Sequence, residues 1–425
     1  MRSKRTLSQY IRWTFLSAAC GVLSGTAASI FLISLDWVTK ARTEFPAIIW
    51  GLPLAGLFIG LVYHHFGKDV AAGNNLILDE IHDPQRTVPF HMAPLVLLGT
   101  IITHLFGGSA GREGTAVQMG ASLSDQLTHF FKIEPEERKI LLTAGAGAGF
   151  GAAIGAPWAG MVFGMEVINI GRLRFFAWFE CLIASFFGYY TAVFLKAPHS
   201  VYPAIEIPGV DWRTIVFVAL AGVAFGLTAK LFTMSTHFVE RTVNRWISYP
   251  PLKPFLGGLL IAVLFYFDGT YRYSGLGIPY IQEALTQATG FRDPVLKSIF
   301  TSLTVGTGFK GGEFIPLVFI GTTLGSALSV ILPVSFALLA ALGFAAVFGG
   351  AANTPIACTL MAMEIFGYRI GPYALLACFV SYYFSGHYGI YRSQKVHMKK
   401  HEKLLWCLGW LGELPRRFLN GNGRK

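Results

Sequence analysis

The stretch FGAAIGAPWA at residues 150–159 returns in outline as FGGAANTPIA at residues 348–357, which is 198 positions further along the chain. The phenylalanine, the first glycine, the proline and two alanines keep their places in both copies. The pair Met165–Glu166 recurs as Met363–Glu364 at the same distance. This agreement indicates that the chain contains one structural unit twice.

A second set of matches supports the duplication. Gly111 and Gly120 correspond to Gly312 and Gly321 at a distance of 201 positions, close to the first value of 198. A proline-rich stretch, residues 197–212, lies between the two copies. Two separate segments with almost the same offset are hard to obtain by chance, so we predict an internal duplication with the proline-rich stretch as its connection.

The composition indicates a membrane protein. Of the 425 residues, 53% are hydrophobic and only 13% are charged. An average soluble chain carries about 25% charged residues, so this chain cannot cover a globular surface of its size. The composition therefore excludes a soluble enzyme, a disordered chain and a fibrous protein.

Apolar segments recur along most of the chain. They run at about 13–38, 46–66, 93–107, 139–170, 175–196, 212–236, 253–268, 294–307, 314–348, 353–366 and 371–388. Several are shorter than the ~20 residues that cross a bilayer at right angles, and glycines interrupt others. Such helices are tolerated in a membrane when they are buried in protein or line a wet cavity. Broken helices in a duplicated chain are typical of transporters whose site lies between the repeats.

These patterns predict the domain organisation. We expect a single transmembrane transport domain over residues 1–425, with a first repeat at 13–196, a second repeat at 212–395 and a basic tail at 396–425. Lys and Arg outnumber Asp and Glu by 34 to 23, and the excess gathers partly at the two ends. The positive-inside rule then predicts that both termini are cytoplasmic.

The sequence argues against several other partners. A nucleic-acid-binding protein needs a basic, polar domain, and none is present. The five cysteines are scattered without a CxxC spacing, so we interpret them as packing residues. We expect no metal and no cofactor.

Charged residues inside apolar segments are costly, so each is a functional hypothesis. The candidates are Arg112, Glu113, Glu166, Lys310, Glu313 and Glu364. Glu166 and Glu364 occupy equivalent places in the two repeats. This symmetry favours a structural role, in which both carboxylates bind backbone or arginine partners at helix ends.

Three glycine-rich stretches predict an anion site. Gly111-Arg112-Glu113-Gly114 and Gly311-Gly312-Glu313-Phe314 each follow an apolar segment and open a helix, and Gly73-Asn74 offers a third helix start. Exposed N–H groups and the helix dipole attract an anion to such a start. An asparagine adds an amide N–H donor. Three converging starts would bind an anion without a full positive charge.

Glu113 is the unusual residue in this predicted site. An ionised Glu113 could occupy the site as a tethered anion, and a protonated one could swing out and carry a proton. Burial favours the neutral form of a carboxyl, which makes proton uptake feasible. The alternative is that Glu113 and its neighbour Arg112 only cap the helix start.

An intramembrane enzyme is a rival of another class. Residues 107–111 match the GxSxG pattern of a nucleophilic serine, here Ser109. That motif requires a preceding strand and a partnered histidine, whereas an apolar helix is predicted before it and His104 is the single candidate base. The histidines at positions 64, 65, 82 and 104 lie near loop edges, and we interpret them as surface or interface residues.

At these motifs the sequence resembles the CLC family of chloride channels and anion/proton antiporters. Residues 111–115 resemble its GREGP motif, residues 312–316 resemble GxFxP, and residues 73–77 lie where the family has GSGIP. Residues 389–391 resemble the segment that supplies an anion-coordinating tyrosine, here Tyr391. The order and spacing agree from residue 13 to about 395.

The departures from the family pattern point to one branch. Asn74 replaces the coordinating serine, Thr115 replaces the motif proline, and the second motif carries Glu313. Val167 stands where chloride/proton antiporters have an internal proton-transfer glutamate, and we expect no regulatory CBS domain after the last helix. In these features the chain resembles the fluoride/proton antiporter branch, CLC-F.

The resemblance implies a fold and a function. It implies an all-α polytopic membrane protein of two inverted repeats of tilted, partly broken helices, which forms a homodimer in the lipid bilayer of the inner (plasma) membrane. It also implies a transporter, with no enzymatic activity, that exports fluoride in exchange for protons. A chloride/proton antiporter or a passive chloride channel of the same fold remains the nearest alternative.

The resemblance also implies roles for individual residues. Glu113 would be the gating and proton-carrying glutamate. The anion would be bound by the backbone N–H groups of Phe314 and Ile315, the Asn74 side chain and the Tyr391 hydroxyl. The helix start formed by Gly111, Arg112 and Gly114 would contribute to the same site, and Glu313 would couple protons or set selectivity.

Overall fold

The computed structural model describes residues 6–400 and is mostly helical. The helices of the first half are α1 (Leu7–Glu44), α2 (Leu52–Phe66), α3 (Asn74–His82), α4 (Met92–Leu105), α5 (Glu113–Asp125), α6 (Leu127–Phe130), α7 (Pro135–Ile154), α8 (Pro157–Glu166) and α9 (Trp178–Phe194). The helices of the second half are α10 (Trp212–Trp246), α11 (Leu252–Asp268), α12 (Ile278–Thr286), α13 (Arg292–Gly306), α14 (Phe314–Leu328), α15 (Phe336–Ala352), α16 (Pro355–Phe366) and α17 (Gly371–Phe384). The described residues form one pair of short parallel strands, β1 (Asn169–Ile170) and β2 (Lys395–Val396).

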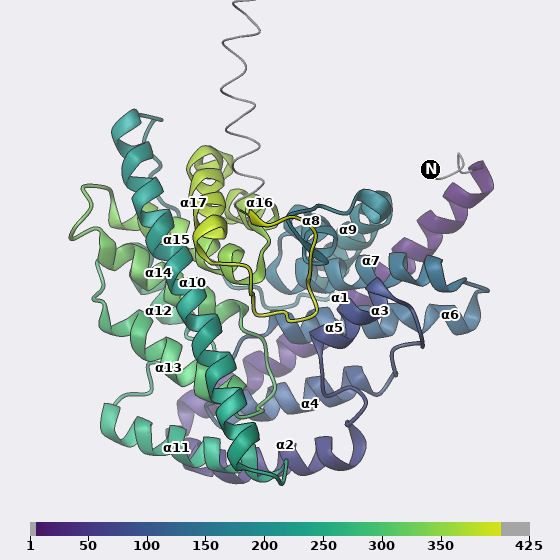
Figure 1. Ribbon diagram of the computed structural model, residues 1–425, viewed down its shortest axis with the longest axis horizontal. Coiled ribbons are helices and arrows are strands. Elements are labelled where there is room, and N and C mark those ends of the chain that lie inside the picture. The colour runs from purple at the N-terminus through teal and green to yellow at the C-terminus, as the bar shows by residue number, and fades with distance from the viewer. Residues whose placement is uncertain (1–5, 401–425) are drawn as a thin grey trace, which may run out of the picture.

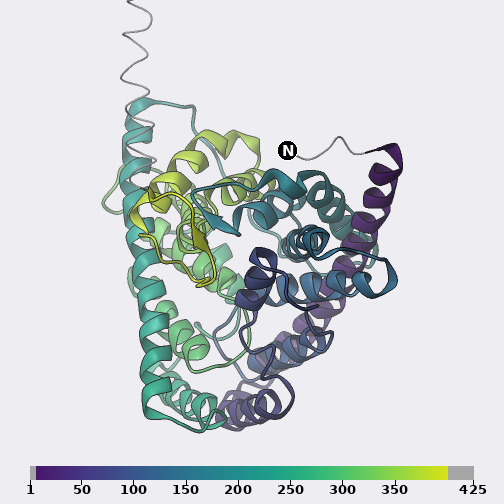
Figure 2. The same cartoon turned by 45° about the vertical axis from the view of Figure 1, so that its right-hand side comes forward.

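The two halves meet along the middle of the molecule. Figure 1 shows the first half in purple and blue on the right and the second half in green and yellow on the left. In Figure 2 the two longest helices, α10 and α1, flank opposite sides of the molecule. Each begins its half, so the predicted duplication is visible as two similar successions of helices.

The repeats are inverted, as predicted. Glu166 at the end of α8 accepts hydrogen bonds from the first backbone N–H groups of α16, at 3.0 and 2.8 Å. Glu364 at the end of α16 accepts the corresponding bonds from the start of α8, at 2.9 and 2.8 Å. The end of each helix therefore lies beside the start of the other. A two-fold axis that crosses the two helices produces this antiparallel arrangement, and the predicted structural role of the two carboxylates is confirmed.

Four segments of the described chain are long and apolar enough to cross a membrane: α1, residues 46–66, residues 175–194 and α10. The other apolar helices are shorter, with 10 to 17 residues in α4, α14, α15 and α16. They pack inside the longer ones, which keeps their unpaired ends away from lipid. The fold is thus the expected polytopic bundle of long and broken helices.

Two of the expected apolar segments are divided in the structure. The segment 139–170 forms α7 and α8, because Gly155 ends the first helix in the left-handed conformation (φ 85°) and Pro157 begins the second. The segment 314–348 forms α14 and α15, with residues 329–335 between them. Hydropathy missed both breaks since the residues on either side are equally apolar.

Repeated glycines explain how closely the inner helices pack. Gly120 of α5 lies against Gly145 of α7, and Gly321 of α14 lies against Gly343 of α15. A Cβ atom on any of the four would overlap the backbone of the facing helix. The sequence match between Gly120 and Gly321 therefore marks the same helix contact in each half, which brings the starts of α5 and α14 toward the centre.

Aromatic rings fill the space between the halves. Phe150 and Phe348, which are equivalent in the repeat, stack with their ring centres 6.1 Å apart. Phe314 packs edge-on against both, at 5.5 and 4.6 Å. This cluster fixes the first residue of α14 against α7 and α15.

Candidate functional site

The two glycine-rich loops join at the centre of the molecule. The N–H of Gly111 donates to the carbonyl of Gly312 at 2.5 Å, and the N–H of Gly312 donates to the carbonyl of Gly111 at 2.7 Å. A Cβ on Gly312 would lie 2.7 Å from the backbone N of Gly114, so a side chain cannot fit there. Glycine at these positions is therefore what lets the backbones of the two repeats pair directly.

Three helix starts come together around this pair, as the sequence predicted. Helices α5 and α14 begin directly after the two loops, at Glu113 and Phe314. The start of α3 is also close, because a Cβ on Gly114 would lie 3.2 Å from the Asn74 amide nitrogen and 3.0 Å from the Cα of Gly312. The backbone N–H groups at these starts and the Asn74 amide are donors of the kind that bind anions.

Glu113 is buried at the start of α5, with 1% of its surface exposed. Its carboxylate accepts hydrogen bonds from the side chain Nε of Arg112 at 3.1 Å and from the backbone N of Arg112 at 3.2 Å. The Arg112 guanidinium also donates to the Ser200 hydroxyl at 3.2 Å. The pairing of the two neighbours, which the sequence left open as an alternative, is thus the contact in this conformation. If the Glu113 side chain moves, it must exchange its hydrogen bonds with Arg112 for hydrogen bonds with other groups.

Phe314 and Ile315 begin α14 and are 3% and 1% exposed. The backbone N of Ile315 faces Gly111, where an added Cβ would lie 3.0 Å from it. The first residues of α14 are therefore close to the loop that carries Glu113. The structure brings together Gly111, Glu113, Gly114, Phe314 and Ile315.

Tyr391 reaches the same region from the end of the chain. Several hydrogen bonds hold the segment that carries it. They include Ile390 N to the carbonyl of Ala351 at 3.0 Å, Ser393 N to the Asn75 side chain at 3.1 Å, and Asn353 Nδ2 to Gln394 Oε1 at 2.9 Å. Tyr391 itself is 9% exposed. The pairing of β1 with β2 follows directly and anchors the segment.

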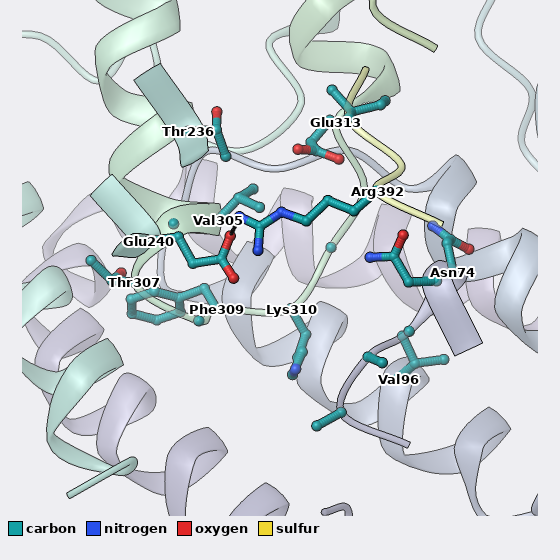
Figure 3. A pocket seen from close by; sticks show the side chains of 18 of the residues that line it. Asn74, Val96, Thr236, Glu240, Val305, Thr307, Phe309, Lys310, Glu313 and Arg392 are labelled. Carbon is teal, nitrogen blue, oxygen red and sulfur yellow. Dashed lines mark hydrogen bonds and ion pairs between the residues drawn. The ribbon is translucent and has the colours of Figure 1, made fainter. Parts of the chain in front are cut away.

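A polar pocket of about 310 Å³ opens beside the site. Its lining includes three of the predicted site residues, Asn74, Glu313 and Tyr391. Figure 3 labels the first two. Glu113, Phe314 and Ile315 are not part of this lining and lie deeper in the protein. The predicted site therefore has two layers, with Asn74 and Tyr391 at the pocket and Glu113 behind them.

Lys310 is a further charged candidate in the pocket. Its ammonium nitrogen lies 3.9 Å from the centre of the Tyr63 ring, which is a cation–π distance. Its aliphatic chain packs on Gly99, where an added Cβ would lie 2.8 Å away. The lysine is thus positioned at the pocket wall by α2 and α4.

Sequence reasoning missed three charged residues of the pocket, Glu240, Lys253 and Arg392. Glu240 and Arg392 form an ion pair with each other. Arg392 follows Tyr391 directly, and this adjacency is a signal that could have marked it. Glu240 lies in the polar last third of α10, and nothing near it in the sequence indicates that it faces Glu313.

His104 corrects one prediction from the sequence. It is fully buried, where a surface or interface position was expected, and its Nε2 lies 3.5 Å from the carbonyl of Gly111. His104 and Gly111 are seven residues apart in the chain. The sequence therefore did not show that the loop folds back and buries the histidine.

Ser109 lacks the geometry of a nucleophile. Its hydroxyl pairs with the Thr301 hydroxyl at 2.8 Å, and its backbone N donates to Thr304 at 3.1 Å. The histidine that a serine hydrolase requires instead contacts the carbonyl of Gly111. The GxSxG match therefore reflects a packed, hydrogen-bonded loop.

Comparison with known proteins gives a consistent result. The sequence profile of the family described as voltage gated chloride channel matches residues 55–386. A chloride/fluoride channel protein of Pseudomonas syringae pv. tomato is 48% identical over 400 residues, which are 93% of this chain and 88% of that protein. An H⁺/Cl⁻ exchange transporter of Vibrio parahaemolyticus is 27% identical over 82% of this chain and 81% of its own length.

Solved structures that are similar to this one include two antiporters. The crystal structure of a CLC-type fluoride/proton antiporter superposes with a TM-score of 0.89 at 31% identity, over 92% of this chain and 100% of that one. A slow cyanobacterial Cl⁻/H⁺ antiporter superposes with a TM-score of 0.76 at 20% identity, over 88% and 94% of the two chains. The second likeness concerns the fold alone.

Proposed function

The chain belongs to the voltage-gated chloride channel family, CLC, and we propose that it is a fluoride/proton antiporter. It exports fluoride from the cytoplasm in exchange for protons that move inward. It is a transporter and not an enzyme, as is the family to which it belongs.

One observation carries this proposal: the Asn74 amide lies beside Gly114, where the starts of α5 and α14 meet, and Gly114 follows the buried Glu113. Helix starts provide partial positive charge for any small anion. Fluoride is small and strongly hydrated, so its site must replace a tightly held water shell with strong donors. An amide N–H from Asn74, backbone N–H groups of Phe314 and Ile315 and the Tyr391 hydroxyl supply such donors.

Glu113 is the proton carrier in this proposal. In its ionised form it competes with fluoride for the same donors, and in its protonated form it leaves them free. Binding of the anion and binding of the proton are thus linked at one residue. The helix start on which this exchange takes place is shaped by Gly111, Arg112 and Gly114. A second carboxyl, that of Glu313, lies on the pocket side.

The chloride/fluoride channel protein and the fluoride/proton antiporter among the relatives support fluoride as the substrate. The more distant H⁺/Cl⁻ exchange transporter supports chloride as the alternative. Asn74 and Val167 favour fluoride, because both depart from the chloride/proton antiporter pattern. A passive chloride channel is disfavoured by the two carboxyls at the site.

The cellular setting is also part of the proposal. The multi-pass chain lies in the lipid bilayer of the inner membrane as a homodimer, with both termini in the cytoplasm. The single transport domain has its repeats at 13–196 and 212–395. Within the tail at 396–425, residues 401–425 lie outside the described residues.

The test is efflux from proteoliposomes loaded with equal concentrations of fluoride and chloride. We expect fluoride to leave faster, measured with ion-selective electrodes in the same preparation. Equal or faster chloride efflux would assign the chain to the chloride alternative.

A further inference from the structure

The pocket beside the site is lined by two glutamates and one arginine. Glu240, Glu313 and Arg392 all contribute to its lining (Figure 3). The Arg392 guanidinium pairs with Glu240, and the charges of both residues act on Glu313. No hydrogen bond or ion pair holds the Glu313 carboxyl among residues 6–400. The arginine that pairs with Glu240 therefore lines the same pocket as a second acid, Glu313.

The other charged and titratable groups of the pocket either contact a different partner or are not carboxyls. Lys253 donates to the Asn244 side chain at 2.7 Å, and Lys310 lies over the Tyr63 ring. His237 lies three residues before Glu240 on α10 and is the histidine of the lining. Among the described lining residues, Glu240 and Glu313 are thus the two that carry a carboxyl.

The positions of Glu240 and Arg392 suit the transfer of protons between bulk water and the site. The side chains of Glu240 and Arg392 are 38% and 46% exposed, so water reaches both. An ion pair with this exposure is weak, at about 0 to 1 kcal/mol, and it opens easily. Arg392 is also the residue after Tyr391, which connects any movement of the pair to the anion site.

We propose that Glu240 is the proton port on the pocket side and that Arg392 is the counter-ion it shares with Glu313. The proton passes from the protonated Glu313 carboxyl to the Glu240 carboxylate, directly or through pocket water, and then to bulk water. Arg392 pairs with whichever carboxyl is ionised. Charge and protons balance, because one acid gains the proton that the other loses. This inference rests on the proposed function.

The experiment measures fluoride efflux and proton uptake together in proteoliposomes at several pH values on the pocket side. We expect Glu240→Gln to slow coupled exchange at least about tenfold and to flatten its pH dependence, because a proton-transfer group is lost. Glu240→Asp retains a carboxyl and keeps most of the rate. Asp36→Asn is the matched control, since it breaks the exposed Asp36–Lys40 pair on α1, far from the pocket in the chain.

The double variant Glu240→Gln/Arg392→Gln separates a proton port from a structural pair. It removes both charges, so no unpaired arginine remains. Exchange that stays slow supports the proposal, and exchange restored to the wild-type rate overturns it. The proposal is also overturned if His237→Gln abolishes the pH dependence of exchange while Glu240→Gln keeps the wild-type pH dependence. The Asp and double variants carry the test if Glu240→Gln alone fails to insert.

The outcomes keep the two proposals apart. Wild-type vesicles that release fluoride without taking up protons contradict the proposed function, whatever the variants do. Wild-type vesicles that exchange normally, with Glu240→Gln equally fast at every pH, contradict only the role of Glu240.

Discussion

Two carboxylate pairs show where this protein keeps its internal symmetry and where it departs from it. Glu166 and Glu364 are equivalent in the repeat, and each accepts two hydrogen bonds from the first N–H groups of the opposite helix. The starts of α5 and α14 are also equivalent, yet their first residues differ. The residue before the helix is Arg112 in one half and Glu313 in the other, and the first helical residue is Glu113 or Phe314.

The difference teaches how function is placed on a duplicated scaffold. Where the role is to satisfy backbone groups, both copies need the same acceptor, and the sequence keeps it. At the helix starts, one half presents a buried acid held by arginine and the other presents an acid to a wet pocket. The two equivalent helix starts therefore carry different charges within a symmetric fold.

The largest effect is expected at the asymmetric acid. Glu113→Gln removes the carboxyl that we propose as the proton carrier but leaves a side chain of the same shape. We expect coupled fluoride/proton exchange to fall by at least about 100-fold, since a proton-carrying group is lost. Proton uptake per fluoride released measures this. An unchanged ratio would show that residue 113 belongs with the structural carboxylates.

The pairing of the loops can be broken without changing any charge. The methyl group of Gly312→Ala would lie 2.7 Å from the backbone N of Gly114, so the two helix starts must separate. We expect fluoride efflux to fall at least about tenfold, because such overpacking costs about 1 to 3 kcal/mol and displaces the donors. Gly290→Ala is the control, because no atom lies within 4 Å of the added group. Equal rates in the two variants would mean that the loop contact does not position the site.

The selectivity of the site is tested at Asn74. Asn74→Ser replaces an amide donor with a hydroxyl and leaves both acids in place. We expect the preference for fluoride over chloride to drop by about tenfold or less, since one donor among several is weakened. The measurement is the ratio of the two efflux rates. An unaltered ratio would remove Asn74 from the anion site.

The symmetric pair is expected to affect stability and not transport. Glu166→Gln and Glu364→Gln each weaken two charge-assisted hydrogen bonds at a helix start, which costs about 1 to 3 kcal/mol. We expect a lower unfolding temperature in detergent for both variants, with the exchange ratio of the wild type. A changed exchange ratio in one of them would place that carboxylate in the proton pathway and break the contrast drawn above.

Much of this fold could be predicted from the sequence. The repeated FG, Pro-Ala and Met-Glu positions predicted two related halves, and the structure shows why they recur: they mark the α7–α8 and α15–α16 corners and the reciprocal caps. The apolar segments predicted the long helices. They did not reveal α3 and α12, which are nine-residue helices. Their amphipathic sequences carry no membrane signal.

The meeting of the helix starts was predicted in part. Glycine and asparagine at these positions indicated which loops and helix starts lie together, because those residue types have local geometric causes. Glu240 and Arg392 were missed, because 152 residues separate them in the chain and only the packing of α10 on the last segment brings them together. His104 was misplaced for a similar reason, since its buried contact depends on the pairing of two loops.

The central claim is that amides at converging helix starts and one mobile carboxyl take turns at a single site. It is tested most directly by imposing an inward proton gradient on proteoliposomes that hold equal fluoride inside and outside. We predict that fluoride leaves against its developing gradient while the lumen acidifies, and that removal of the proton gradient stops both. Fluoride that moves only down its own gradient, with no acidification, would contradict the claim.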